Sequence, residues 1–251
     1  MRLDNLVHYD NKVILTYSNA TYWDLLRTNR VMDYKWENGK TNRNVYEPGP
    51  FISPLDLSLM ANHIGFNGFI EFSGVGILFV ERSNNLSVGK KTWGTSVSSQ
   101  ISPKFDYKKG EHFTLDKFYS SIAESINREL KYFEVNGNSI EIKRDQIEGS
   151  IFAFYRDLVE GGKPQFLLYY KYENGSDTSL NVIFNKSGKK SCLKKDKIDA
   201  VIDGTKSFIT INQLKEACIT QDEIFVSEQK KKYRMTPSAV ASVVMLLEAV
   251  K

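Results

Sequence analysis

Apolar and polar residues recur along the chain with two spacings, one typical of strands and one typical of helices. The pattern of short runs rich in β-branched and aromatic residues predicts a first strand over KVILTYS, residues 12–18. It predicts two more over FNGFIEF and VGILFVERS, joined by a hairpin at Ser73-Gly74. Further strands are predicted at KTWGTSVSSQI, SIEIKRDQ, GSIFAFYRDL, PQFLLYYKYE, SLNVIFNK, FITI and EIFVSE.

Helices are predicted where apolar residues recur every three or four positions behind a capping residue. Ser53 precedes Pro54, with Asp56 at a capping-box spacing, so FISPLDLSLMANHIG is predicted to form a helix that stops at Gly65. The same logic predicts a last helix from Thr236-Pro237. Other helices are predicted at YWDLLRTN, at NQLKEAC and over residues 113–137.

The order of these elements predicts an α/β (α+β) fold, with helices flanking a mixed or largely antiparallel sheet. The polar, turn-rich stretch KWENGKTNRNVYEPGP separates an N-terminal lobe from the rest of the chain. We therefore expect an N-terminal lobe over residues 1–59, a core over 60–182, and C-terminal strands and a helix over 183–251 packed on that core.

Composition excludes several classes of protein. The apolar runs are too short to span a bilayer and the N-terminus has no signal-peptide core, so we expect a cytoplasmic protein with no membrane partner. The two cysteines, Cys192 and Cys218, lie 26 residues apart with no nearby histidine, which argues against a zinc site or a disulfide framework.

Positive charge is concentrated near the C-terminus. Residues 181–251 hold 13 basic and 8 acidic residues, whereas the whole chain has a net charge of only +4. The excess lies in KSGKKSCLKKDK and QKKKYR, neither of which has the interleaved aromatic residues of a nucleic-acid groove. Solvated loop charges are the favoured interpretation, nucleic acid is disfavoured, and a protein partner stays open.

The segment FTLDKFYSSIAESINRELKYFEVNG carries one misplaced charge. With Thr114 as N-cap and about 100° per residue, Phe118, Ile122 and Ile126 form one apolar stripe. Glu129 falls inside that stripe, where an unpaired carboxylate would be costly to bury. Either a basic side chain pairs with Glu129, or Glu129 faces a ligand cleft as a base or metal ligand.

In the order of its motifs, the chain resembles the Nudix hydrolase family over residues 60–182. GILFVERS is similar to the family's strand that ends in a basic turn, and KTWGTSVSSQI to the strand that precedes the Nudix box. A helix with Arg128-Glu129-Leu130 follows, and then the strands of IEGSIFAFYRDLVEGGKPQFLLYY. The resemblance implies a mixed sheet sandwiched by helices.

The family signature, G-x5-E-x7-R-E-U-x-E-E-x-G-U with U a bulky aliphatic residue, holds divalent cations against a pyrophosphate. Aligned on Arg128-Glu129-Leu130, the upstream glutamate is replaced by Ser120, and the glutamate pair by Tyr132 and Phe133. One carboxylate cannot hold the usual cluster of cations. The resemblance therefore implies a degenerate catalytic helix.

From this resemblance we expect a protein that binds a nucleotide or another diphosphate-containing small molecule with little or no metal-dependent hydrolysis. The ligand-binding candidates are Arg82, Lys91 and Trp93; Glu129 is the candidate base, with Arg128 orienting it. Whether the chain is an enzyme stays open. The alternatives are an active, divergent Nudix hydrolase using Mg²⁺ or Mn²⁺ held in part by Glu129, and a protein-interaction subunit.

Overall fold

The computed structural model describes residues 1–10, 12–82, 89–101, 113–173, 182–184 and 206–251. The chain forms two compact units. The first contains residues 1–66, 100–113 and 154–166, and the second contains residues 67–99, 114–153 and 167–251. The boundary between them falls inside the strands β3 (Gly65–Phe72), β9 (Ile151–Asp157) and β10 (Lys163–Tyr172). The boundaries expected from the sequence, 1–59, 60–182 and 183–251, stay a prediction.

The main sheet has the strand order β12-β4-β3-β10-β9, with β5 beside β4 and β6 beside β3. The hairpin of β3 and β4 (Gly76–Glu81) is antiparallel, as is the pair of β4 with β12 (Lys206–Ile209). β3 and β10 run in the same direction, because Gly68 lies against Leu168 and the Ser73 amide donates to the Tyr172 carbonyl at 3.1 Å. The sheet is therefore mixed.

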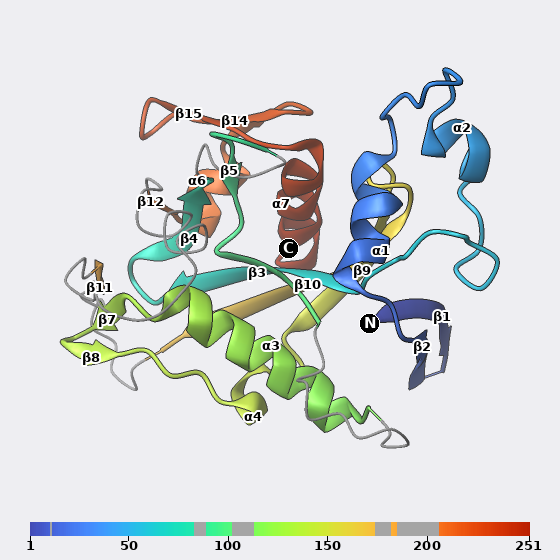
Figure 1. Ribbon diagram of the computed structural model, residues 1–251. Helices are drawn as coiled ribbons and strands as arrows, with labels where there is room; N and C mark the ends of the chain where they lie inside the picture. Colours follow the sequence, from blue (N-terminus) through green and yellow to red (C-terminus); the bar gives the residue numbers. More distant parts are fainter. Residues whose placement is uncertain (11, 83–88, 102–112, 174–181, 185–205) are drawn as a thin grey trace. The chain divides into compact units, whose positions relative to one another are not determined.

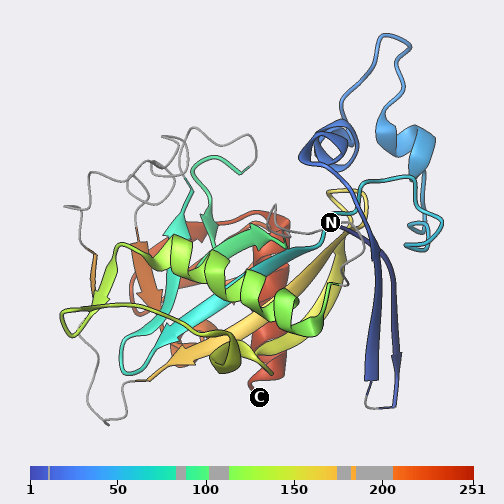
Figure 2. The same ribbon diagram turned by 60° about the horizontal axis from the view of Figure 1, so that its bottom comes forward.

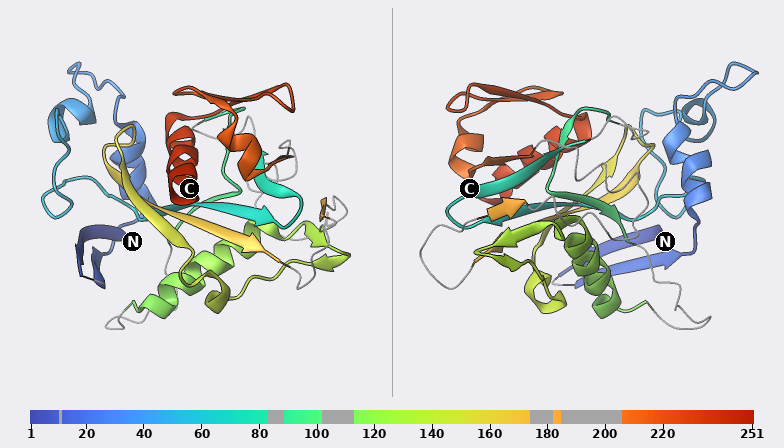
Figure 3. Two further views of the ribbon diagram at one scale, coloured as in Figure 1. Left: turned by 180° about the vertical axis from the view of Figure 1, so that it is seen from behind. Right: turned by 60° about the vertical axis from the view of Figure 1, so that its left-hand side comes forward.

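Helices cover both faces of this sheet in the second unit. Figure 1 shows α3 (Leu115–Leu130) across one face and α7 (Pro237–Ala249) on the other, and Figure 3 shows the same arrangement from behind. The α7 face carries the apolar core, in which Phe69, Phe79 and Leu246 have no exposed surface. Burial of such side chains is the main source of stability in a domain of this kind.

Short elements complete the second unit. β7 (Phe133–Val135) pairs with β8 (Asn138–Ser139) and β11 (Val182–Phe184). β13 (Cys218–Ile219), β14 (Glu223–Val226) and β15 (Lys231–Arg234) form another small sheet. The remaining elements are β5 (Trp93–Gly94), β6 (Val97–Gln100), α4 (Arg144–Ile147) and α6 (Ile211–Lys215).

The first unit begins with a two-stranded antiparallel ribbon of β1 (Arg2–Tyr9) and β2 (Lys12–Ser18). Figure 2 shows this ribbon at the N-terminus of the chain. Three short helical elements follow: α1 (Tyr22–Arg27), the 3-10 helix η1 (Asn29–Val31) and α2 (Asn42–Tyr46). Thr21 and Thr41 cap α1 and α2 through full capping boxes, which compensates for the small number of hydrogen bonds inside helices this short.

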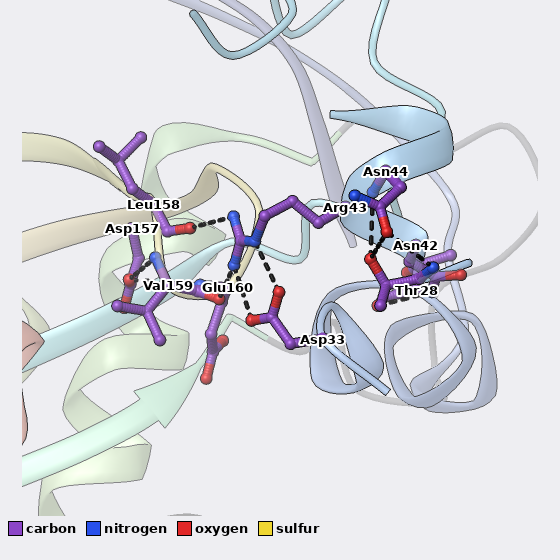
Figure 4. Close-up of polar contacts among 10 residues, drawn as sticks. Thr28, Asp33, Asn42, Arg43, Asn44, Asp157, Leu158, Val159 and Glu160 are labelled. Carbon is purple, nitrogen blue, oxygen red and sulfur yellow. Dashed lines mark hydrogen bonds and ion pairs between the residues drawn. The ribbon is translucent and has the colours of Figure 1, made fainter. Parts of the chain in front are cut away.

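Polar side chains connect distant segments of the first unit. Arg43 of α2 donates to both carboxylate oxygens of Asp33, and also to the carbonyls of Leu158 and Val159 at 3.0 Å each (Figure 4). Asp157 stabilises the same β9–β10 turn, because its Oδ1 accepts a hydrogen bond from the Val159 amide at 3.0 Å. One guanidinium thus joins α2, the loop after η1 and the β9–β10 turn.

The predicted helix over residues 51–65 is wrong. Residues 51–64 form turns and extended chain, and Gly65 begins β3. The Ser53 carbonyl, which would accept the first hydrogen bond of the helix, accepts from the Arg156 guanidinium instead. Leu57 and Leu59 are 70% and 74% exposed, so this segment has no buried helical stripe.

Most other predicted elements are confirmed, with changes at their ends. KVILTYS forms β2, and the hairpin turns at Ser73-Gly74 with Gly74 at φ +73°. SIEIKRDQ forms only the short β8 and α4, β1 was not predicted, and QKKKYR contributes β15 rather than a loop. The basic stretch at 186–197, including Cys192, lies outside the described residues.

The predicted fold class is confirmed: the chain is mixed α/β, with a mixed sheet flanked by helices. Within the described part of the chain, no helix is long and apolar enough to cross a membrane.

Candidate functional site

Helix α3 forms where the sequence predicts it and ends earlier than expected. Thr114 caps it by accepting a hydrogen bond from the Lys117 amide at 3.3 Å, and Asp116 lies in the first turn, where the helix dipole favours a negative charge. Phe118, Ile122 and Ile126 are buried along one face. The helix stops at Leu130, so Tyr132 and Phe133 lie beyond it.

Arg128 and Glu129 occupy the last turn of α3 and contact each other. Arg128 Nε lies 3.7 Å from Glu129 Oε1, and the two side chains are 39% and 29% exposed. Arg128 also donates through Nη2 to Ser125 of the same helix and to Ser99 of β6, each at 3.2 Å. The partly buried carboxylate therefore has a basic neighbour, and Arg128 links the end of α3 to the sheet.

The two positions aligned with the signature's glutamate pair carry core side chains. Tyr132 is 8% exposed and Phe133 is 2% exposed, and Phe133 pairs with Phe184 as the first residue of β7. Within the described segments, no group of three or more His, Cys, Asp or Glu side chains is placed to hold a metal ion. The residues on α3 thus do not fit the usual cluster of cations.

Arg82 and Lys91 lie on the connection between β4 and β5. The Arg82 amide donates to the Thr92 carbonyl at 2.8 Å, and the Lys91 amide donates to the Arg82 carbonyl at 3.0 Å. Lys91 has φ +52° and an exposed side chain. Gly89, at φ +64°, lies so close to Thr92 and Thr236 that an added Cβ would fall within 3.0 Å of both. The chain around Gly89 is therefore closely packed, and Arg82 and Lys91 are both part of this connection.

Trp93 is part of the core rather than an open aromatic platform. Its side chain is 6% exposed and its ring meets Tyr233 edge-on, with centroids 4.9 Å apart. Lys231 Nζ lies 4.2 Å from the Trp93 centroid and 4.7 Å from that of Tyr233, within range of a cation–π interaction. Burial raises the pKa of Tyr233, and its hydrogen bond with Ser207 opposes that shift.

Arg82 and Trp93 point to opposite faces of the sheet. Trp93 lies opposite Glu81 in the ladder, so the two side chains share a face, and neighbouring residues along a strand alternate between faces. Trp93 shares the α7 face with Ile77 and Phe79 of the core. Arg82 follows Glu81, directly after the end of β4, so the same alternation assigns its side chain to the face opposite that of Trp93.

Comparisons with known proteins find likeness only among solved structures. No family model matches the chain, and no curated protein matches it. Two structures of a bifunctional NMN adenylyltransferase/ADP ribose pyrophosphatase from Francisella tularensis, one with AMP and a Mn ion, each match with TM-score 0.37 and 14% identity. They match over 82% and 83% of this chain, which spans only 44% and 45% of theirs.

A third likeness is to a MutT protein from Methanosarcina mazei Go1, with TM-score 0.36 and 10% identity over 74% of this chain and 92% of that one. At these TM-scores the likeness is weak, and the chemistry of this chain rests on its own residues.

The sequence candidates thus fall into two groups. Glu129 and Arg128 lie at the end of α3, alternation assigns Arg82 to the face opposite Trp93, and Lys91 lies exposed beside Arg82. Trp93 belongs to the α7 face, together with Lys231, which sequence reasoning did not single out. A signal for Lys231 was present: in KKYR, Lys231 and Tyr233 are two residues apart and so share one face of a strand.

Proposed function

We propose that the chain binds a nucleotide or another diphosphate-containing small molecule with little or no metal-dependent hydrolysis. The observation that carries this proposal is the replacement of the signature's glutamate pair by Tyr132 and Phe133, which are buried and lie past the end of α3. Neither side chain offers a carboxylate, and neither could acquire a metal-binding role without leaving the core.

Charge supports binding in the absence of a cation cluster. A pyrophosphate needs positive charge around it, and Arg or Lys side chains can provide that charge in place of metal ions. Arg82 and Lys91 lie together on the connection after β4, where the Lys91 amide donates to the Arg82 carbonyl, and the Lys91 side chain is exposed. The arginine can bind two phosphate oxygens at once, whereas the lysine acts as a point charge.

A divergent metal-dependent hydrolase is the second candidate, and one observation favours it. Glu129 keeps 29% of its side chain exposed despite the neighbouring Arg128. In that function Glu129 would serve as a base or a single metal ligand, and Mg²⁺ or Mn²⁺ would supply the Lewis acid.

A thermal-shift screen of nucleotides and dinucleotides, each with and without Mg²⁺ or Mn²⁺, tests the proposal. Ligands that bind only the folded state raise its stability, by about 2.7 kcal/mol when present at 100 times their Kd. We expect at least one diphosphate compound to raise the melting temperature without metal, and Arg82→Ala to remove that rise.

Turnover assays on the same compounds separate the two candidates. Glu129→Gln should leave metal-free binding intact, and its matched control is Glu124→Gln, an exposed position on the same helix. Metal-dependent cleavage that Glu129→Gln abolishes and Glu124→Gln spares would overturn the binding proposal in favour of the hydrolase.

A further inference from the structure

The outer edge of β2 is an unpaired strand edge. β2 pairs with β1 along one side, and within the described residues no strand pairs with its other side. Figure 2 shows the two-stranded ribbon of the first unit. Val13 and Ile14 are 56% and 46% exposed. Apolar edge strands of this kind are templates for pairing with another strand.

The register shows which backbone groups are available on that edge. Tyr9 lies opposite Lys12 where the ribbon turns, and a pair that closes a two-residue connection exchanges both hydrogen bonds. Hydrogen-bonded and non-hydrogen-bonded pairs alternate along an antiparallel ladder, so Leu6 and Leu15 form a non-hydrogen-bonded pair. The backbone groups of such a pair point away from the partner strand. The N–H and C=O groups of Val13, Leu15 and Tyr17 therefore point outward.

The neighbouring strand has a different edge. The outer side of β1 is used at its base, where the Leu3 amide donates to the Asn62 carbonyl and the Ile64 amide donates to the Met1 carbonyl, both at 3.1 Å. Arg2 and His63 also form a bridge there. Within the described part of the chain, the backbone of β2 makes no hydrogen bond on its outer side. β2 contacts the rest of the unit through the side chain of Tyr17, whose hydroxyl accepts from the Phe113 amide at 2.6 Å and donates to the Phe113 carbonyl at 3.3 Å. The two backbone edges of the ribbon are therefore not equivalent.

We propose that β2 pairs edge to edge with β2 of a second copy of this chain. Leu15 is the midpoint of Lys12–Ser18, so two antiparallel copies centred on it overlap along their whole length. The two Leu15 residues then face each other across a twofold axis, and the outward groups supply about six backbone hydrogen bonds.

Side chains on β2 suit this self-pairing. In the register centred on Leu15, Val13 meets Tyr17 of the second copy, an aromatic and β-branched pair of the kind that stabilises antiparallel sheets. Lys12 is the only charged residue of β2, and it meets Ser18, so no like charges face each other. A two-stranded ribbon is marginally stable alone, and a four-stranded sheet is not.

Sedimentation velocity on the full chain over a concentration series tests this interface. The unaltered protein should show a monomer–dimer equilibrium. Leu15→Lys places two ammonium groups opposite each other, which should raise the dissociation constant of the dimer by about tenfold or more. An unaltered protein that stays monomeric at every concentration overturns the proposal.

Two further variants keep the test independent of folding. Leu6→Lys is the matched control, because Leu6 pairs with Leu15 on the inner strand and does not meet its own copy; it should leave the dimer intact. Leu15→Lys and Leu15→Glu should each be monomeric alone and should associate when mixed. Equal loss of association in Leu6→Lys, or no association in the mixture, contradicts pairing through β2.

Discussion

The two units of the chain are stabilised by different interactions. In the second unit the buried polar residues are Asn67 and a few serines and threonines, and the centre is a continuous apolar cluster. In the first unit the buried residues include Glu47, His63, Asp157 and Lys163. Among the described residues, every buried charged side chain belongs to the first unit.

Hydrogen bonds of the first unit run through a chain of side chains. Glu47 accepts from Ser58 at 3.0 Å, and the Ser58 hydroxyl accepts from Asn62 at 2.9 Å. The backbone amide of Asn62 donates to Asn29 Oδ1 at 3.0 Å, and the side-chain amide of Asn29 donates to the Glu160 carbonyl at 2.7 Å. Segments more than 100 residues apart in the chain are thereby joined by directional contacts.

The difference has a physical consequence. Apolar packing is non-directional and scales with buried area, so removing one large side chain removes a large amount of stabilisation. Each hydrogen bond in a network contributes less free energy of stabilisation than a large apolar side chain does. Removing one partner is nevertheless costly, because it leaves a buried polar group without a hydrogen bond. The two units should therefore respond to different substitutions.

The largest effect is expected from Phe79→Ala in the second unit. Phe79 has no exposed surface and its ring lies 6.1 Å from that of Phe69, so truncation leaves a cavity that costs about 3–5 kcal/mol. Denaturant unfolding measures this loss. Leu115→Ala, at a position 59% exposed, is the control and should change little. A cost for Phe79→Ala as small as that of the control would contradict an apolar centre for this unit.

A smaller loss is expected from Asn29→Ala in the first unit. The substitution leaves the Asn62 amide and the Glu160 carbonyl without their side-chain partner, at a cost of about 2 kcal/mol. Amide hydrogen exchange at Asn62 reports the loss locally, and the exposed Asn19→Ala is the control. Unchanged exchange at Asn62 would show that the network does not stabilise this unit.

The same difference explains which parts of the fold could be predicted from the sequence. In the second unit local pattern and tertiary structure agree: Thr236 and Pro237 begin α7, Thr114 begins α3, and alternation marks β3 and β4. In α3 the apolar face of the pattern is the face that the core buries, and β3 and β4 are buried on both faces, as their nearly continuous apolar sequences indicate.

In the first unit the local pattern was misleading. Ser53, Pro54 and Asp56 have the spacing of a helix start, but Glu47 takes the Ser53 amide and Arg156 binds the Ser53 carbonyl. Glu47 and Arg156 reach Ser53 only through the tertiary structure, so the spacing of residues around Ser53 could not predict these contacts. Arg43 is a second case, because its four acceptors are the two carboxylate oxygens of Asp33 and the carbonyls of Leu158 and Val159, which meet only in the folded unit.

The candidate site was predictable in part for a related reason. Helical periodicity placed Glu129 inside the apolar stripe, and its side chain is partly buried, 29% exposed, with Arg128 next to it. The end of α3 at Leu130 was not predicted, since Phe133 continues the stripe in the sequence although it begins β7. The assignment of Arg82 and Trp93 to opposite faces of the sheet depends on how β4 pairs with β5. The pattern of residues within a single strand does not reveal this pairing.

The smallest effect is expected from pH and should also be confined to the first unit. Burial lowers the pKa of His63 below its ordinary 6.5, while a hydrogen bond between Nδ1 and Gln100 Oε1 at 2.8 Å opposes the shift. The unfolded chain therefore binds a proton before the folded chain does as the pH falls. The free energy of unfolding should decrease below about pH 6.5 and level off once the folded pKa is passed.

His63→Gln should make this pH dependence shallower, whereas His8→Gln, at an exposed position of the ribbon, should leave it unchanged. Hydrogen exchange at the Leu3 and Ile64 amides, which bond to the carbonyls of Asn62 and Met1, measures the effect next to His63. Amides in the core of the second unit, such as that of Phe79, serve as the internal reference. If their protection falls with pH as steeply as that of Leu3, then the two units unfold together in acid, and His63 does not set a difference between them.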